Sequence, residues 1–341
     1  MAPRIVTRDD LAGAARAAFG GGRRLAAVER LTGGSRKGVY RLTMDDATTA
    51  IAYLWEDSEN YWPSTDADAG DLFTAGVGLG LFEAAHARLA ALGLRVPAIY
   101  LADRDRAHYR ADLAIVEDFT GEHLMDLLAR DPRAAEPTMA RLADALAVMR
   151  RHRAPSFGKV ALVDGGGSAS GASCEAGALH FGLSCLAEAA ARDPRIAAAR
   201  GRLEERLRSL AAAVRPRAEY SVVHGELGLD HVLVDPSGRP VLIDIEDLMY
   251  FDVEWEHVFL RIRLGSDYAR LAVGGLDEDR LALYTLTQRL SLTAGPLRLL
   301  DGDFPRREFM RGVAEHNLKE ALALAQQADA TGASSAPPAI R

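Results

Sequence analysis

Residues 221–256 read SVVHGELGLDHVLVDPSGRPVLIDIEDLMYFDVEWE, and the interpretation of the whole chain starts from this stretch. Two short β-type segments, residues 232–234 and 240–243, flank the sequence DPSG at residues 235–238. Asp opens a turn, Pro sets φ, and Gly accepts a positive φ, so these four residues predict a tight turn. The stretch is therefore expected to form a β-hairpin with acidic residues near both of its ends.

The acids at the two ends of this hairpin are arranged as phosphoryl transfer requires. Glu226, in the sequence HGE that begins at His224, precedes the hairpin, and Asp244 follows its second strand. Phosphoryl transfer needs a carboxylate at the attacking hydroxyl and an Asp after the next strand to hold the metal ion on the phosphates. We therefore take Glu226 as the candidate base and Asp244 as a candidate metal ligand.

Protein kinases carry this arrangement as H-R-D-x-x-x-x-N followed by D-F-G. The stretch resembles the aminoglycoside phosphotransferase family, whose pattern is H-G-D-x-x-x-x-N, a hairpin, and then I-D. Three positions depart from it: Glu226 replaces the Asp, His231 replaces the Asn, and Tyr53 replaces the strand Lys or Arg that grips the α- and β-phosphates. The resemblance covers about residues 25–325.

The resemblance implies an α+β fold of the protein-kinase type, with a small antiparallel-sheet lobe and a large helical lobe that carries the catalytic β-hairpin. Residues 1–117 would form the nucleotide-binding lobe, residues 118–325 the catalytic and substrate lobe, and residues 326–341 a disordered tail. Strands are expected at residues 25–31, 39–43, 50–55, 93–100 and 113–116. Helices are expected at residues 8–19, 72–92, 124–130, 137–153, 176–191, 195–214 and 257–325.

The resemblance also implies nucleotide contacts from a Gly-rich turn between the first two strands. Backbone N–H groups of such a turn, here Gly33, Gly34 and Ser35, can face phosphate oxygens. Because Tyr53 brings no cation, Lys37 at the tip of the turn is our candidate for the missing positive charge. The alternative is that Lys37 is a solvated loop lysine.

Three further residues complete the nucleotide site that the resemblance implies. Glu83 lies where the family has the acid that pairs with the strand lysine, and we expect it to pair with Lys37 or to hydrogen-bond to Tyr53. The alternative is a surface glutamate. Glu117 and Phe119 follow the hinge pattern, in which backbone groups hydrogen-bond a purine edge. Side chains matter little there, so both ATP and GTP fit.

The metal site leaves alternatives open, because magnesium prefers oxygen ligands and imidazole suits softer divalent ions. Asp244 can hold Mg²⁺ with help from Glu246 or Asp230. Alternatively, His231 binds an ion such as Mn²⁺, or it serves only as a hydrogen-bonding group. The candidate metal ligands are therefore His231, Asp244 and Glu246.

Composition excludes several other classes of protein. The net charge of −7 argues against a nucleic-acid binder, which would carry a basic footprint. Two cysteines make neither a disulfide framework nor a zinc site. No secretory signal and no apolar run of membrane-spanning length occur, so a cytoplasmic protein without a membrane partner is expected. Nothing in the sequence indicates an oligomeric state.

The function implied is transfer of the γ-phosphate of ATP or GTP, with Mg²⁺ or Mn²⁺, to a hydroxyl of a small molecule. An antibiotic, as in antibiotic resistance, or a natural-product intermediate is the expected acceptor class. His224 is included with Glu226 in the catalytic loop, where we expect it to pack and hydrogen-bond. Because three positions depart from the family, the alternative is a pseudokinase or a partner-dependent subunit that binds nucleotide or a peptide in natural-product biosynthesis.

Overall fold

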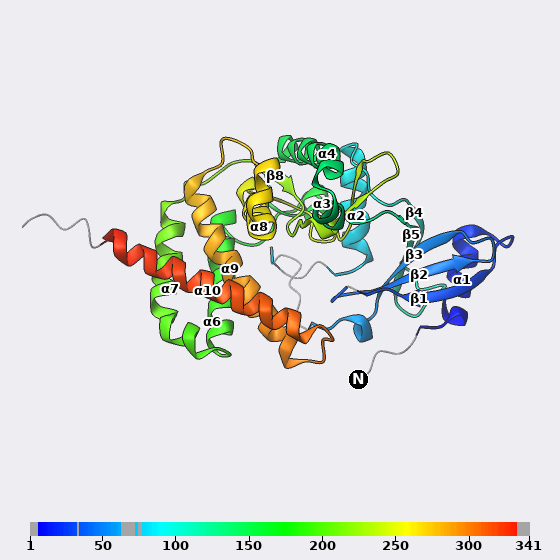
Figure 1. Ribbon diagram of the computed structural model, residues 1–341, viewed down its shortest axis with the longest axis horizontal. Helices are drawn as coiled ribbons and strands as arrows, with labels where there is room; N and C mark the ends of the chain where they lie inside the picture. Colours follow the sequence, from blue (N-terminus) through cyan, green and yellow to red (C-terminus); the bar gives the residue numbers. More distant parts are fainter. Residues whose placement is uncertain (1–5, 33, 63–71, 74–76, 333–341) are drawn as a thin grey trace, which may run out of the picture.

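The structure is a computed structural model, and it describes residues 6–32, 34–62, 72–73 and 77–332, the last six by their backbone alone. A small lobe built on one sheet lies beside a larger helical lobe along the long axis of the molecule (Figure 1). This arrangement confirms the expected α+β fold with an antiparallel sheet in the N-terminal lobe. No helix among the described residues is long and apolar enough to cross a membrane.

The small lobe is an antiparallel sheet of five strands in the order β1-β2-β3-β5-β4. Its elements are α1 (Arg8–Phe19), β1 (Leu25–Arg30), β2 (Gly38–Met44), β3 (Thr49–Trp55), η1 (Asp57–Glu59), α2 (Leu79–Ala91), β4 (Ile99–Asp103) and β5 (Asp112–Glu117). Helix α1 begins as expected, because the Thr7 side chain accepts the Asp10 N–H and the Asp10 carboxylate accepts the Thr7 N–H in return.

Both faces of β3 are covered, and this decides which way its side chains point. Ala52 and Leu54 pack with Leu11 of α1, whereas Ile51 and Tyr53 pack with the core that the small lobe shares with the helical lobe. Successive residues of a strand point to opposite faces, so a single register sets both groups. Tyr53 is therefore aimed toward the helical lobe.

Two expected boundaries of the small lobe differ from the structure. Helix α2 begins at Leu79 instead of residue 72, after Gly78 with a φ of +120°. Gly residues at 76, 78 and 80 weaken the helix there, because glycine loses the most conformational freedom on becoming helical. Strand β4 begins at Ile99, not at residue 93, and residues 92–98 form the connection from α2 into the sheet.

The helical lobe follows the hinge after β5. Its helices are α3 (Leu124–Arg130), α4 (Pro132–Arg151), α5 (Val160–Asp164), α6 (Cys174–Ala190), α7 (Pro194–Ala213), η2 (Leu229–His231), α8 (Val253–Leu264), η3 (Gly265–Arg270), α9 (Glu278–Asp301) and α10 (Arg307–Gly332). Its strands are β6 (Arg153–Ala154), β7 (Gly158–Lys159), β8 (Tyr220–Val223), β9 (Val232–Val234), β10 (Pro240–Leu242) and β11 (Met249–Phe251). In Figure 1, α6, α7, α9 and α10 form the end of the molecule farthest from the sheet.

Two helix boundaries in this lobe also differ from the expectation. Helix α4 begins at Pro132, five residues before Pro137, because the Asp131 side chain accepts the N–H groups of Arg133 and Ala134. Helix α10 extends to Gly332, beyond the expected start of a disordered tail at residue 326. Residues 333–341 lie outside the described residues.

The hairpin on which the sequence analysis is based forms as expected. Val241 of β10 pairs with Leu233 of β9 in an antiparallel register. In the turn, Oδ1 of Asp235 accepts the Ser237 N–H at 2.8 Å, and Gly238 has a φ of +73°. The acid, the proline and the glycine thus act as turn chemistry predicts.

A buried ion-pair cluster supports the segment that follows the hairpin. Asp252 and Arg280 are each 1% exposed, and Nε of Arg280 lies 2.8 Å from Oδ2 of Asp252. The Tyr284 hydroxyl donates to the same oxygen. Nη1 of Arg217 lies 3.3 Å from the other Asp252 oxygen. The cluster therefore fixes the start of α8 against α9.

We predict that Arg280→Met lowers the free energy of unfolding by about 3–5 kcal/mol, because removing one partner leaves a buried charge poorly compensated. Urea denaturation would measure the loss. Arg208→Met is the matched control, since Arg208 is exposed and pairs with Glu204 on the same helix. Its loss should stay below about 1 kcal/mol. Equal losses in the two variants would contradict the assigned role of the cluster.

Candidate active site

Two segments that are far apart in the sequence meet beside the hairpin. The Gly-rich turn before β2 brings Lys37, whose Nζ lies 2.9 Å from Oδ1 of Asp244 and also donates to Glu246. Its neighbour Arg36 reaches Oδ2 of Asp247 at 3.3 Å. The turn therefore lies directly against the acids that follow β10. Gly33 lies outside the described residues.

Trp255 and Glu256 of α8 hold the backbone of the catalytic loop before the hairpin. The Glu256 carboxylate accepts the backbone N–H groups of His224 and Gly225, and Nε1 of Trp255 donates to the Gly225 carbonyl at 3.1 Å. Gly225 has a φ of +96°, and a Cβ there would approach the Asp247 carbonyl at 3.1 Å. Trp255 and Glu256 thus hold the backbone of the loop in place.

His224 is a buried connection between this loop and the hairpin. It is 0% exposed, and its Nε2 lies 3.0 Å from the Ile243 carbonyl oxygen, which can only accept a hydrogen bond. Burial, helped by the neighbouring His231, lowers the pKa of His224 to about 4. The imidazole is therefore neutral at neutral pH, which fits the expected packing and hydrogen-bonding role.

Glu226 lies in the loop before the hairpin, close enough to feel the charge of Arg36 in the Gly-rich turn, and its side chain is exposed to solvent. The protein walls around it still limit its hydration. This desolvation, followed by repulsion from Asp247, raises the pKa of the Glu226 carboxyl, and the charge of Arg36 opposes the shift. The pKa of this carboxyl is thus shifted upward, which is the direction in which active sites tune a carboxylate that acts as a general base.

His231 joins the two key acids. Its Nδ1 lies 2.9 Å from the Glu226 carbonyl oxygen, which accepts, so Nδ1 carries the proton. Nε2 is then left facing Oδ2 of Asp244 at 3.5 Å. The backbone of Glu226 and the side chain of Asp244 therefore lie on either side of one imidazole ring.

Asp244 has the conformation of a functional residue. Its φ is +56°, which is uncommon for any residue except glycine and costs of the order of 1–3 kcal/mol. Its side chain is 51% exposed, so it remains accessible to a ligand. The charge of Lys37 holds the pKa of this carboxyl well below its usual range.

Glu246 and Asp247 form ion pairs with basic side chains of the site. Glu246 is 4% exposed, and its desolvation raises the pKa of the carboxyl, although Lys37 opposes the shift. Asp247 accepts from Lys159 of β7 and from Arg36. Burial alone would raise the pKa of Asp247, but these two cations outweigh it and lower the pKa. Neither acid is an open ligand.

Asp244 and His231 fit a divalent ion that arrives with a nucleotide. Mg²⁺ is usually held by one or two carboxylates together with substrate phosphates and water, and imidazole nitrogen suits Mn²⁺. Over the described ranges, no cluster of three or more His, Cys, Asp or Glu side chains is placed to hold an ion without other ligands. Glu246 gives its oxygen to Lys37, so the expectation that it helps bind the metal stays a prediction.

The alternative of a solvated loop lysine at Lys37 is wrong. The residue is 7% exposed, and its ammonium lies 4.8 Å from the centre of the Tyr53 ring. Val39 of β2 pairs with Tyr53 of β3, so the turn before β2 lies next to the position where the family has its strand cation. The ammonium thus reaches that region from the neighbouring strand.

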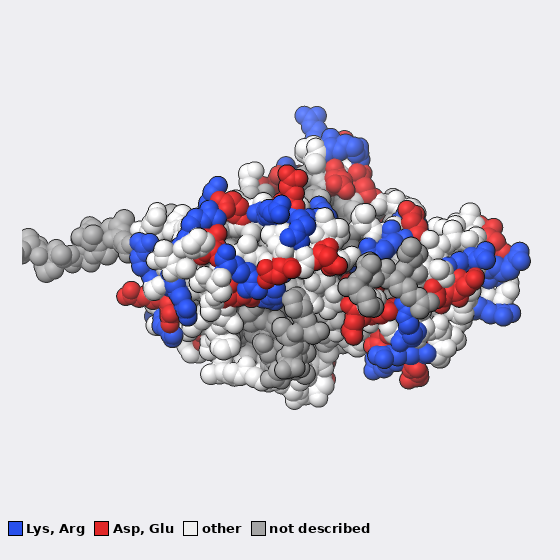
Figure 2. Space-filling view, turned by 90° about the horizontal axis from the view of Figure 1, so that it is seen from below, with Lys and Arg blue, Asp and Glu red and all other residues white. Residues whose placement is uncertain are grey.

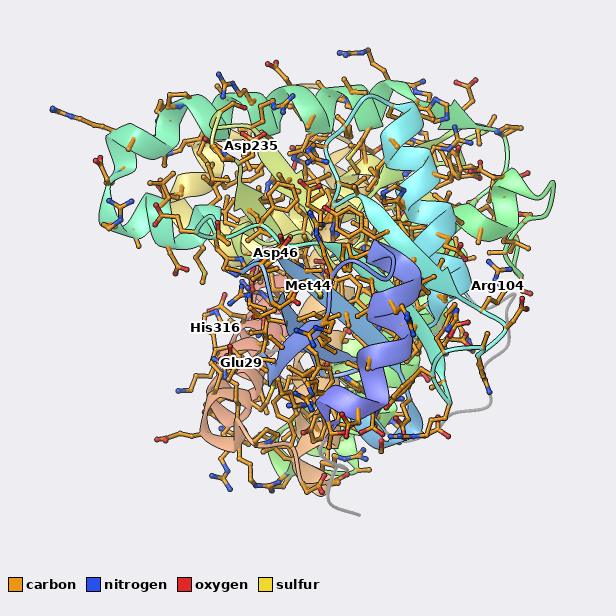
Figure 3. All side chains as sticks on the ribbon, turned by 90° about the vertical axis from the view of Figure 1, so that its right-hand side faces the viewer. Glu29, Met44, Asp46, Arg104, Asp235 and His316 are labelled. Carbon is orange, nitrogen blue, oxygen red and sulfur yellow. The ribbon has the colours of Figure 1, made fainter. Side chains whose placement is uncertain are left out.

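The expected pairing of Glu83 with Lys37 or Tyr53 is also wrong. Glu83 pairs with Arg104, which Figure 3 shows at the outer edge of the small lobe, far across the view from Asp235 of the hairpin turn. The inward face of α2 instead presents Phe82, whose ring lies edge-on to Tyr53 with 5.6 Å between centres. Helix rotation places an apolar side chain inward here and turns the acid outward.

The hinge residues lie where the pattern places them, and their side chains pair locally. Glu117 ends β5, and both of its oxygens lie 2.7 Å from Nη2 of Arg95. The Arg95 guanidinium lies 4.9 Å from the centre of the Phe119 ring. Asp118 accepts from Arg41 of β2 at 2.7 Å. Their backbone groups at the hinge remain the candidates for contacts with a purine.

Lys159 was not among the site residues predicted from the sequence, and no partner was predicted for Arg36. One signal in the sequence points to both buried lysines. The chain has 41 Lys and Arg residues, but only Lys37, Lys159 and Lys319 are lysines, and two of these three lie in the site. In so arginine-rich a chain, a lysine marks a position that requires a compact ammonium group.

Part of the acidic segment at residues 56–71 covers the Gly-rich turn. Nε1 of Trp62 donates to Oγ of Ser35 at 2.9 Å, and the Arg36 guanidinium lies 5.1 Å from the centre of the indole ring. On the helical lobe, Arg298 of α9 lies 5.7 Å from the same ring. Trp62 thus pins the turn between the lobes. Residues 63–71 lie outside the described residues.

Comparison with known proteins gives the class. The family model described as the phosphotransferase enzyme family matches residues 78–292, which is more than half of the chain. The chain therefore belongs to the phosphotransferase enzyme family, and the suspected resemblance is confirmed. A search of curated protein sequences finds no match.

Solved structures share the fold at low identity. Choline kinase LicA from Streptococcus pneumoniae is 14% identical, with a TM-score of 0.57, and the match covers 89% of this chain and 94% of that chain. A thermostable mutant of aminoglycoside phosphotransferase APH(4)-Ia, in a ternary complex with AMP-PNP and hygromycin B, is 16% identical with a TM-score of 0.58. That match covers 92% of this chain and 97% of that chain. These likenesses confirm the kinase-like, two-lobed fold.

We predict that stability falls as pH rises from about 4.5 to about 7 through the buried Glu256. Desolvation raises its pKa to about 7 from the ordinary 4.5, so the folded state holds a proton that the unfolded chain has already lost. The contribution, of the order of 1–3 kcal/mol, is complete below pH 4.5 and is lost above pH 7.

Urea denaturation at several pH values would test this. Glu256→Gln should flatten the profile over that window, because the side chain no longer titrates. Glu320→Gln, a matched change at an exposed site on α10, should leave the profile unchanged. An identical slope in the wild type and in Glu256→Gln would show that another group causes the pH dependence.

Proposed function

We propose that this protein transfers the γ-phosphate of ATP or GTP to a hydroxyl group of a small molecule. The observation that carries the proposal is the convergence of Glu226 and Asp244 on the two sides of His231, directly beneath the Gly-rich turn. Family membership supports the same reaction class. Transfer of this kind depends on positioning and electrostatic stabilisation, which such a convergence supplies.

In this proposal Glu226 orients the acceptor hydroxyl and takes its proton as the hydroxyl oxygen attacks the γ-phosphorus. Its carboxylate is exposed to solvent. Its backbone carbonyl accepts from His231, and the preceding Gly225 N–H donates to the Glu256 carboxylate. Mg²⁺ or Mn²⁺, held by Asp244 and His231, would supply charge neutralisation on the phosphates. Glu reaches about one carbon further than Asp, so the acceptor lies correspondingly further from the loop backbone.

The nucleotide would lie between the turn and the hinge. Backbone N–H groups of Gly34 and Ser35 would face phosphate oxygens, and Lys37 would supply the cation that Tyr53 does not. Backbone groups of residues 117–119 would meet the purine edge. The solved relatives bound to AMP-PNP or AMP support the binding of a nucleotide.

The acceptor is proposed to be a small hydroxyl compound, such as an antibiotic or a natural-product intermediate. The relatives named as choline kinase and as an aminoglycoside phosphotransferase with hygromycin B support this class. A macromolecular acceptor with a charged surface is less well supported. Acidic and basic side chains are interspersed on the face shown in Figure 2, without a large field of one sign over its described part.

One observation favours a second candidate, a pseudokinase that binds nucleotide without transferring phosphate. Lys37 already neutralises Asp244 and Glu246, so the chain by itself balances charges that an active kinase leaves for metal ions. Turnover separates the two candidates. The pseudokinase would bind AMP-PNP but would consume no ATP with any acceptor.

We predict that Glu226→Gln lowers kcat by about 10²–10⁴-fold, the usual contribution of a general base, and leaves the affinity for AMP-PNP unchanged. ATP consumption with Mg²⁺ or Mn²⁺ and a library of hydroxyl compounds would measure it. Glu83→Gln is the matched control, because Glu83 pairs with Arg104 on the surface. A Glu226→Gln enzyme as fast as the wild type would rule out Glu226 as the base.

We also predict opposite shifts of the pH profile from two neighbours of Glu226. Activity should fall as pH falls through the raised pKa of this carboxyl, because only the ionised form accepts a proton. Asp247→Asn removes the repulsive charge, so the acid limb of kcat/KM should move to lower pH. Arg36→Gln removes an attractive charge, so the limb should move to higher pH. Shifts in the same direction would show that the limb reports another group.

A further inference from the structure

The ammonium group of Lys37 lies at the point where two carboxylates of the site meet. Nζ is 2.9 Å from Oδ1 of Asp244 and donates also to Oε1 of Glu246, and the Lys37 side chain is only 9% exposed. Two carboxylates that converge on one cation make the arrangement by which proteins hold a divalent ion. In this chain the convergent cation belongs to the protein itself.

The contacts of the turn hold this ammonium in place. On one side of Lys37, Ser35 accepts from Trp62, and Arg36 pairs with Asp247. On the other side, β2 begins at Gly38, where a Cβ would clash with the Glu59 side chain at 2.8 Å. Both neighbours of Lys37 are thus fixed, and its side chain extends into the site from a defined backbone.

The same site lacks an oxygen ligand that kinases use. In protein kinases, the Asn of the catalytic loop and the Asp after the hairpin together hold two Mg²⁺ ions. Here His231 replaces the Asn. Its Nδ1–H donates to the Glu226 carbonyl, so only the nitrogen Nε2 remains as a metal ligand. Glu246 is the nearby oxygen donor that would compensate, and Lys37 occupies it.

We propose that Lys37 takes the place of one of the two divalent ions, so that this chain binds its nucleotide with a single divalent ion, held by Asp244 and His231. An ammonium group has three N–H donors, and Asp244 and Glu246 use two of them. In this proposal the third would donate to a phosphate oxygen. The inference rests on the proposed function, because it requires nucleotide phosphates to lie beside Lys37 and Asp244.

Charge balance supports a single ion. Lys37 pairs with Asp244 and Glu246, and Arg36 and Lys159 pair with Asp247. A second divalent ion at Glu246 would lie within contact distance of the Lys37 ammonium. That repulsion in a partly dehydrated site disfavours two ions while Lys37 is in place.

Metal stoichiometry tests the proposal without requiring turnover. Mn²⁺ would be titrated into protein saturated with AMP-PNP, and the free ion would be followed by electron paramagnetic resonance. The wild type should bind about one Mn²⁺ per chain, where kinases hold two ions. Lys37→Met should bind about two, because Asp244 and Glu246 regain free oxygens. Lys319→Met, a matched change at an exposed lysine of α10, should still bind about one.

Two bound Mn²⁺ ions in the wild type would overturn the proposal, whether or not the Lys37→Met variant folds. A folded Lys37→Met protein that still binds a single ion would overturn it as well. The proposed function fails separately. An enzyme with turnover and two ions retains the function and loses the single-ion inference, whereas an inert protein that binds AMP-PNP with one ion does the reverse.

Discussion

The structure of this site depends on the ion pair that Lys37 makes with Asp244 and Glu246. Buried charges are costly to dehydrate, and removing one partner from such a group destabilises a protein by about 3–5 kcal/mol. The pair joins the turn before β2 of the small lobe to the segment after β10 of the large lobe. It therefore fixes the distance between the Gly-rich turn and the hairpin. That distance sets the space in which a triphosphate would lie.

The loss of the family's strand cation at Tyr53 goes together with changed roles for Lys37 and Glu83. Where the family has a strand cation and a helix acid, this chain has Tyr53 against Phe82 in an edge-to-face contact. Such aromatic pairs contribute about 0.5–1.5 kcal/mol beyond their burial. The positive charge comes from the adjacent strand through Lys37, which rests on the Tyr53 ring, and its acidic partner comes from Glu246. Glu83, no longer needed inside, pairs with Arg104 at the surface.

Beneath the open acids lies a rigid support. Glu256 and Trp255 hold the backbone of the loop that carries Glu226, and Asp252 anchors the start of the same helix through Arg280 and Tyr284. Displacement of a reacting group by about 1 Å can cost on the order of 100-fold in rate. A Glu in the position of the family's Asp is compatible with function only if its backbone is held this firmly.

The sequence by itself determined the features that local chemistry controls. Turn residues specified the hairpin, and Thr7 and Asp10 specified the start of α1. The spacing around the hairpin indicated Glu226 and Asp244, which lie on either side of His231. Only the tertiary structure decided that Lys37 is buried, that Glu83 faces outward and that Lys159 meets Asp247. The contacts of Lys37 span up to 209 residues, and they depend on which distant segments the fold brings together, which no local pattern encodes.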